Sequence, residues 1–131
     1  RAPKHMSKQA LEFFGRTLME EVRDQVIEEF ERIRSGKMKG RMAERLRAQL
    51  EEHPGSGEIL DEVIPLVVDS TMHSVLEMLD QQSPRLRLLV ENPERTAADV
   101  SAVSDGLAGE LYGEGWILKF SRHPQSLLGR D

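Results

Sequence analysis

Apolar residues recur every three or four positions from Ser7 to Ser35, the spacing that places side chains along one side of an α-helix. They are Leu11, Phe14, Leu18, Val22, Val26, Phe30 and Ile33. Acidic residues cover the other side, as a solvated face or as an acidic docking surface. Gly15 weakens the helix by up to about 1 kcal/mol relative to Ala. We expect one long helix, with Ser7 as N-cap and Gly36 at the C-terminal cap.

A second, shorter helix is predicted over residues 37–52, where four apolar residues step by four: Met38, Met42, Leu46 and Leu50. Residues 32–47 carry seven Lys or Arg residues, opposed by Glu44 alone. Arg41 and Arg45 share a helix face, and Arg47 lies at the edge of another. This basic tract is a solvated surface paired with acids of the same fold, a site for an acidic partner or neighbouring subunit, or a phosphate-binding site. No aromatic residue interleaves it, which disfavours base stacking.

The most apolar part of the chain follows a turn at residues 53–57 and extends over residues 59–82. Pro65 lies inside it and either starts a new helix or kinks a continuous one. The stretch 65–82 is apolar over more than half of its circumference, so we expect it to be the central, buried helix. Its deepest residues should be Met72, Val75, Leu76 and Leu79.

The C-terminal part changes character. Residues 85–91 and 116–121 alternate between apolar and polar and predict two short strands. Between them, Thr96 is the expected N-cap of one or two short helical turns, and residues 123–131 are expected to be frayed. The predicted fold is α+β and predominantly α, with three main helices and a small two-stranded antiparallel element near the C-terminus.

The first residues, 1–5, are patternless and look like an expression-vector remnant, which leaves 6–131 as a single domain. The 131-residue chain has no Cys, which excludes disulfides, thiolate nucleophiles and Cys-ligated metal sites. Its net charge of −5 disfavours a general nucleic-acid binder. No apolar run is long enough for a membrane span, and we expect a cytoplasmic protein.

Candidate chemistry is sparse, because phosphate-binding loops, dinucleotide turns and nucleophile elbows are all absent. Asp69, His73 and Glu77 are spaced by four and stack along one helix face. They form either a plain polar ladder around His73, a metal or catalytic site with further unnamed ligands, or a partner contact. Trp116, the one Trp, is either a core residue or an interface anchor.

The stretch 104–121, SDGLAGELYGEGWILKFS, resembles the C-terminal end of small cytosolic bacterial immunity proteins that are encoded beside toxins. This resemblance implies a protein that binds and blocks a cognate toxin without catalysis. No functional residue of that family carries over to this chain.

The function that we expect is therefore non-catalytic protein binding, plausibly neutralisation of a toxin. Acidic residues dominate 12–31 and 51–80 and basic residues 32–47, and opposite patches of this kind orient association. The alternatives are a small enzyme built around His73 and a nucleic-acid-associated regulator using 32–47. We expect no cofactor or metal, no membrane partner, and a possible homo-oligomer. The candidate partner-binding residues are Arg41, Arg45, Arg47, His73 and Trp116.

Overall fold

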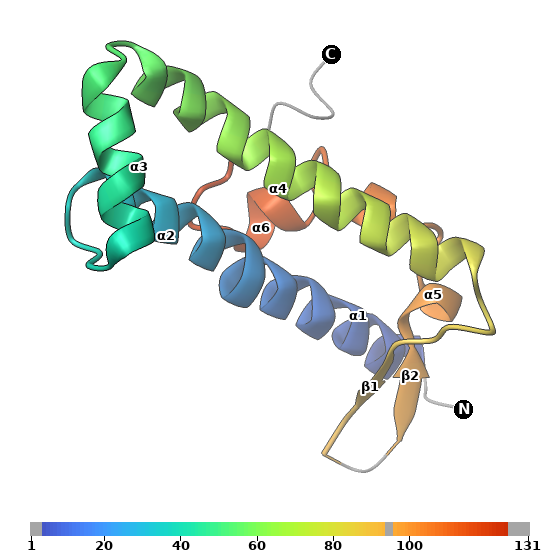
Figure 1. The fold of residues 1–131 in the computed structure, drawn as a ribbon. Helices are drawn as coiled ribbons and strands as arrows, with labels where there is room; N and C mark the ends of the chain where they lie inside the picture. Colours follow the sequence, from blue (N-terminus) through green and yellow to red (C-terminus); the bar gives the residue numbers. More distant parts are fainter. Residues whose placement is uncertain (1–3, 94–95, 126–131) are drawn as a thin grey trace.

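Two long helices that run in opposite directions form the frame of the molecule (Figure 1). The computed structural model describes residues 4–93 and 96–125. The first long helix consists of three consecutive stretches: α1 (Lys4–Leu18), the π-helical turn η1 (Met19–Arg23) and α2 (Asp24–Arg34).

This helix confirms the periodic pattern, with two corrections. Ser7 is not an N-cap, because the helix already includes Lys4 and His5. The apolar stripe is interrupted at Val22, which is exposed, whereas Arg23 and Asp24 are buried. The interruption coincides with the π turn, where the Asp24 N–H bonds the Met19 carbonyl five residues earlier. Gly36 follows the helix with φ +79°, as its expected place at the C-terminal cap requires.

The shorter helix, α3 (Arg41–Glu52), joins the two long ones at one end of the molecule (Figure 1). It begins four residues later than the apolar spacing predicts, after Gly40 with φ +122°. The predicted stripe is also displaced, since Met42 is 77% exposed and Ala43 is the buried residue of this helix.

The second long helix, α4 (Ser56–Gln81), continues through Pro65 and does not restart there. Pro65 has no N–H to bond the carbonyl of Asp61, so the helix lacks one bond of its ladder at this point. Of the residues expected to be deepest in this helix, Met72 and Leu76 are buried, together with Asp69, but Val75 is 47% exposed. The stretch 65–82 therefore has one buried side and one exposed side.

The small sheet lies near the C-terminus, as predicted, but has a different second strand. β1 (Leu89–Glu91) pairs antiparallel with β2 (Ala97–Asp99), with Val90 opposite Ala98. The predicted strand at 116–121 is instead a short helix, α6 (Trp116–Phe120). Trp116 and Ile117 are adjacent and both buried there, a burial pattern that an alternating strand does not produce.

Two more short elements lie between β2 and α6. α5 (Val100–Val103) is capped by Asp99, whose Oδ1 accepts a 3.1 Å hydrogen bond from the Ser101 N–H. Thr96 is therefore not the N-cap; its backbone N–H donates to the side chain of Asn92 across the hairpin. The 3₁₀ turn η2 (Ala108–Glu110) follows.

The core forms where these short elements pack against α1, η1 and α4. Its buried apolar residues are Met19, Met72, Leu76, Val100, Leu107, Leu111, Trp116 and Ile117. The Trp116 ring meets Phe14 edge-on at 5.6 Å between centroids and lies directly on Gly15, where a Cβ would overlap the indole. Gly15 is therefore a packing requirement of Trp116 as well as a weak helix former.

The chain is thus an α+β fold, mostly helical, with one two-stranded antiparallel sheet near the C-terminus. Among the described residues, no helix has both the length and the apolar character needed to cross a bilayer.

Candidate functional site

α4 is apolar on two opposite sides, and only one of them faces the core. Residues nine positions apart in an α-helix are separated by about 180° around its axis. Val67 therefore lies opposite Leu76, and Val63 lies opposite Met72. Leu76 and Met72 are 1% and 6% exposed, whereas Val67 and Val63 are 55% and 39% exposed.

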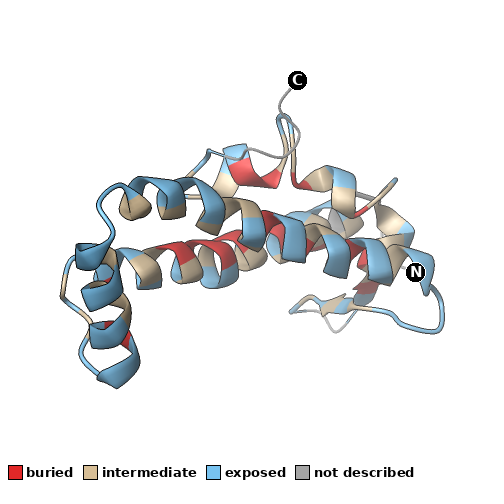
Figure 2. Ribbon diagram, turned by 45° about the horizontal axis from the view of Figure 1, so that its top comes forward, coloured by how far each residue is buried: buried red, intermediate tan, exposed pale blue. Residues whose placement is uncertain are grey.

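The outer side of α4 carries a row of exposed apolar side chains that we call the α4 stripe. Its members are Ile59, Val63, Val67, Val75 and Met78. They recur along most of the helix, and the outward-facing surface of α4 is exposed in Figure 2. Exposed polar residues, Ser70, Thr71 and Ser74, separate Val67 from Val75. Single exposed apolar residues are ordinary, but several of them along one helix mark a surface for interaction.

An acidic flank accompanies the α4 stripe. Exposed Glu58, Glu62 and Glu77 each immediately precede a stripe residue, from which each is turned by about 100° around the helix axis. The sequence has neither Lys nor Arg between positions 48 and 84. Arg34 of α2 provides a positive charge at the N-terminal end of α4, where it pairs with Asp61 and interacts electrostatically with Glu58.

The remaining acids of α4 serve the fold. Asp69 pairs with Arg23, with 2.7 Å between its Oδ1 and the Arg23 Nε, and neither side chain is exposed to solvent. Asp61 forms an ion pair with Arg34 of α2. Asp80 accepts a 2.7 Å hydrogen bond from the Leu107 N–H.

The buried Arg23 also holds the C-terminal segment, residues 121–125, against η1 and α2. Its Nη1 donates to the Ser121 hydroxyl at 2.8 Å and to the His123 carbonyl, and its Nη2 donates to the Gln125 carbonyl at 2.6 Å. Every N–H-bearing nitrogen of this guanidinium thus has an acceptor, which is what a buried Arg needs.

Two carboxylates of α2 complete this arrangement, which we call the C-terminal clasp. Asp24 accepts from the Ser121 hydroxyl and from the Arg122 N–H, at 2.5 and 2.9 Å. Glu28 accepts two bonds from the Arg122 guanidinium, at 2.9 and 3.0 Å, and lies 3.0 Å from the His123 Nε2. The Arg122 guanidinium, followed by the His123 ring, lowers the pKa of Glu28 to about 2. Residues 123–125 are therefore held, against the expectation of a frayed end, and 126–131 lie outside the described residues.

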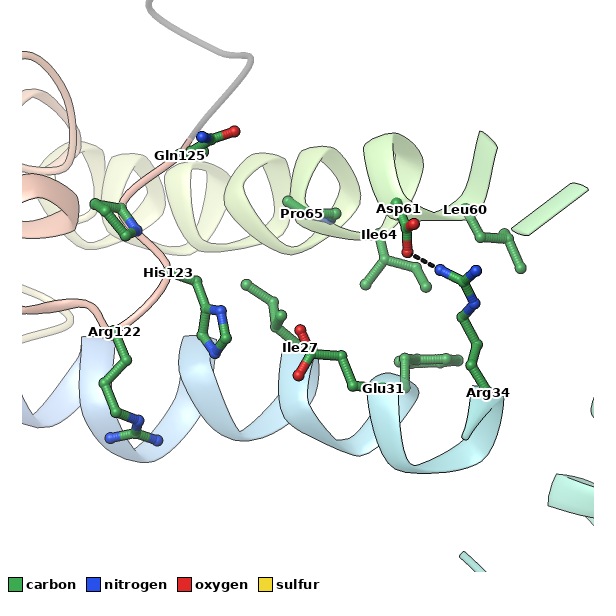
Figure 3. A pocket seen from close by; sticks show the side chains of 12 residues that line it. Ile27, Glu31, Arg34, Leu60, Asp61, Ile64, Pro65, Arg122, His123 and Gln125 are labelled. Atoms are coloured by element: carbon green, nitrogen blue, oxygen red, sulfur yellow. Dashed lines mark hydrogen bonds and ion pairs between the residues drawn. The ribbon is translucent and has the colours of Figure 1, made fainter. Parts of the chain in front are cut away.

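A groove of about 580 Å³ lies between α2, α4 and the C-terminal segment (Figure 3). Its walls include Ile27 and Ile64, which point toward one another from the two helices. The Arg34–Asp61 pair closes one end, and His123 lies toward the other. Four of its polar lining residues have partners within the chain: Arg34 pairs with Asp61, and Arg122 and His123 both meet Glu28. Glu31 lines the groove as well.

The three arginines predicted to contact a partner do not form one patch. Arg41 and Arg45 are exposed on α3, as their spacing predicts. Arg47 is half-buried and turns toward Gly36, where a Cβ would come within 2.5 Å of its Nη1. The charge of Arg47 is thus separated from that of the other two.

His73 joins one partner of the predicted ladder and not the other. Its Nε2 lies 3.2 Å from the Glu77 Oε2, whereas Asp69 is engaged by Arg23. The His73 Nδ1 and the Tyr112 hydroxyl are buried without a hydrogen-bond partner in the described part of the chain, and the two rings lie 5.8 Å apart. Burial, followed by the charge of Asp69, raises the pKa of Tyr112. Within residues 4–93 and 96–125, no three His, Asp or Glu side chains are grouped to hold a metal ion.

Trp116 is 4% exposed and belongs to the core, so it is not available as a surface anchor. Residues 104–121 also contribute Leu107, Leu111 and Ile117 to the core.

Comparison of the chain with protein-family models, with curated proteins and with solved structures finds no match in any of the three.

Sequence reasoning missed both the α4 stripe and the clasp. The stripe residues are visible in the sequence, but so many apolar residues in one helix predicted a central, buried position. The clasp joins Arg23 to residues about one hundred positions away. The spacing of residues within a single helix cannot predict a contact between parts of the chain that are so far apart. One available signal is the pair Arg23–Asp24 itself, two charged residues within an otherwise apolar helical stripe.

Proposed function

We propose that this chain is a non-catalytic protein-binding module and that the α4 stripe is its docking surface. The observation that carries the proposal is the exposure of the stripe directly opposite the core side of the same helix. Covering exposed apolar surface is the main favourable term in most protein association.

The distribution of charge supports this function. The acidic flank of α4 and the exposed Arg41 and Arg45 of α3 lie on different helices, an arrangement that orients an approaching protein. We place the partner and the module in the cytoplasm, in keeping with the absence of Cys. The resemblance of residues 104–121 to immunity proteins favours a cognate toxin as the partner.

Site-specific photo-cross-linking tests the proposal in the cells that express the gene. A benzophenone amino acid replaces Val67, at the centre of the stripe, and in a matched control it replaces Leu118 of α6, which is similarly exposed at 57%. Irradiation should produce a discrete protein adduct from position 67 and none from position 118. Failure to form an adduct at position 67, with the variant folded and expressed, would contradict the proposed docking surface.

A further inference from the structure

We infer that the start of α3 is a second docking surface, which binds a short acidic protein segment that has a large apolar side chain among its acids. We call this surface the α3 patch; its members are Lys39, Arg41, Met42 and Arg45. The patch lies at the end of the molecule that α3 forms (Figure 1). It shares no residue with the α4 stripe and is therefore a surface beyond the one proposed above.

The members of the α3 patch are exposed and close together. Arg45 follows Arg41 by four positions and Met42 by three, so it is a neighbour of both on the helix surface. Lys39 precedes Arg41 by two residues, in the loop that leads into the helix. Met42 is 77% exposed, the highest value among the exposed large apolar residues of the described part of the chain. Ala43 is buried, so α3 turns the patch away from the rest of the molecule.

The fold gives the cations of the α3 patch no acidic partner. Within the described residues, none of Lys39, Arg41 and Arg45 forms an ion pair with an Asp or Glu. In contrast, Arg34 at the end of α2 pairs with Asp61. Arg41 is also the first residue of α3, where the helix dipole opposes a positive charge. Contacts within the chain therefore do not account for this cluster of cations.

The charge of this end of the molecule selects an anionic partner. Residues 32–47 contain seven cations and one acid, which gives them a formal charge of +6. The rest of the chain contains eleven cations and twenty-two acids, a formal charge of −11. An anionic group is therefore attracted to this end and repelled by the remainder of the surface.

The extent of the patch selects a short segment and not a long polyanion. Arg41 and Arg45 are about 6 Å apart along the helix axis, close to the roughly 7 Å between carboxylates two residues apart in an extended peptide. Beyond Arg45, the exposed charged residues of α3 are Glu51 and Glu52, because Arg47 is half-buried. A nucleic acid that followed α3 would meet these carboxylates, and residues 32–47 include no aromatic side chain to stack on a base.

Met42 adds the requirement for an apolar side chain. A Met side chain is unbranched and adapts to the shape of a partner, which suits it to binding surfaces. A large apolar residue beside the acids of the bound segment would cover Met42 while the carboxylates pair with Arg41 and Arg45. An isolated anion such as phosphate would leave Met42 in water.

Three synthetic peptides test this chemistry against the full chain. Each is about ten residues long, labelled with fluorescein and rich in Gly and Ser. The Asp–Leu peptide has two Asp on each side of a central Leu; the Asp–Ser peptide has Ser in place of Leu, and the Asn–Leu peptide has Asn in place of Asp. Fluorescence anisotropy should show the Asp–Leu peptide binding about tenfold more tightly than Asn–Leu and about threefold more tightly than Asp–Ser.

Matched variants locate the binding. Arg41→Gln with Arg45→Gln should weaken binding of the Asp–Leu peptide about tenfold. Arg85→Gln with Arg87→Gln removes the same charge from exposed residues before β1, at the opposite end of the molecule (Figure 1), and should leave this binding unchanged. Met42→Ser should remove the preference for Asp–Leu over Asp–Ser.

Folding of each variant is verified by circular dichroism. The substituted residues are exposed, so the variants should fold. Lys39→Gln, which lies outside any helix, replaces the Arg41, Arg45 double variant if that variant does not fold.

Three results would overturn the inference. Equal losses in the two double variants would show that net charge alone attracts the peptide. Tighter binding of a short DNA duplex than of the Asp–Leu peptide at near-physiological salt, lost in the Arg41, Arg45 variant, would make a nucleic acid the occupant. A dimer in sedimentation velocity that this variant abolishes would make a second copy of the chain the occupant. None of these results changes the adduct expected at position 67.

Discussion

The two ends of the molecule are built differently. At the packed end, α1, η1 and the C-terminal half of α4 meet α5, η2 and α6, and eight apolar residues are buried together. At the open end, α2, α3 and the N-terminal half of α4 meet with few buried residues: Ile27, Ile33 and Ala43. The two ends differ because the short C-terminal elements α5, η2 and α6 pack against only one end of the long helices. The packed end supplies the core, and the open end leaves apolar surface and a groove for other uses.

The clasp gives the largest expected effect, because Arg23 lies where the packed end meets the open end. Arg23→Met leaves Asp69 buried without its counter-charge and should lower the free energy of unfolding by about 3–5 kcal/mol. Chemical denaturation measures this loss. Adding Asp69→Leu should restore much of it, since the unpaired charge is then gone. A loss below about 1 kcal/mol for the single variant would contradict the buried pair.

The two sides of α4 provide the next test. Leu76→Ala should lower the free energy of unfolding by about 2–5 kcal/mol, because it empties a fully buried site. Val67→Ala, on the opposite side, should change it by no more than about 0.5 kcal/mol. Urea denaturation of both variants compares the two sides directly. Similar losses would mean that the outer side of α4 is covered in the folded chain.

The smallest expected effect concerns pH and the clasp. The pKa of Glu28 falls from an ordinary value of 4.5 to about 2 in the folded chain, so its contribution to stability is complete above about pH 5 and is lost as the pH falls toward 2. Glu28→Gln should therefore be less stable than the unchanged chain near neutral pH, and the difference should shrink as the pH falls from about 5 through 2. Denaturation at a series of pH values measures this.

The sequence predicts where helices form better than it predicts which elements pack against them. The long first helix follows from an apolar period that recurs over many turns, although the stripe is interrupted at the π turn. The helix at 116–120 could not be predicted in this way. It is five residues long, and apolar residues at both ends, Trp116 and Phe120, fit a strand pattern as well as a helical one. In the structure β1 pairs with β2, so residues 116–120 are not needed as its partner strand. The helical conformation instead allows Trp116 to be buried against Gly15.

The candidate site was predictable only in part. The exposure of Arg41 and Arg45 follows from their spacing on a short helix. The exposure of the α4 stripe could not be predicted from the sequence. Apolar residues are stabilised by removal from water, but the sequence does not show whether the same chain or a partner covers them. Asp69 illustrates the same limit, since it shares a helix face with His73 in sequence but is held by Arg23, 46 residues away.

The π turn decides which side of α2 faces inward. Hydrogen bonding to the fifth residue takes one residue more into the turn than ordinary α-helical bonding. The same residues in a uniform α-helix would rotate α2 by about 100° relative to α1. Ile27 and Ile33 would then leave the inner side, and Glu28 would no longer meet Arg122. Related genes that lack one residue between Met19 and Arg23 should accordingly have an uninterrupted α-helix there, with α2 facing the same side.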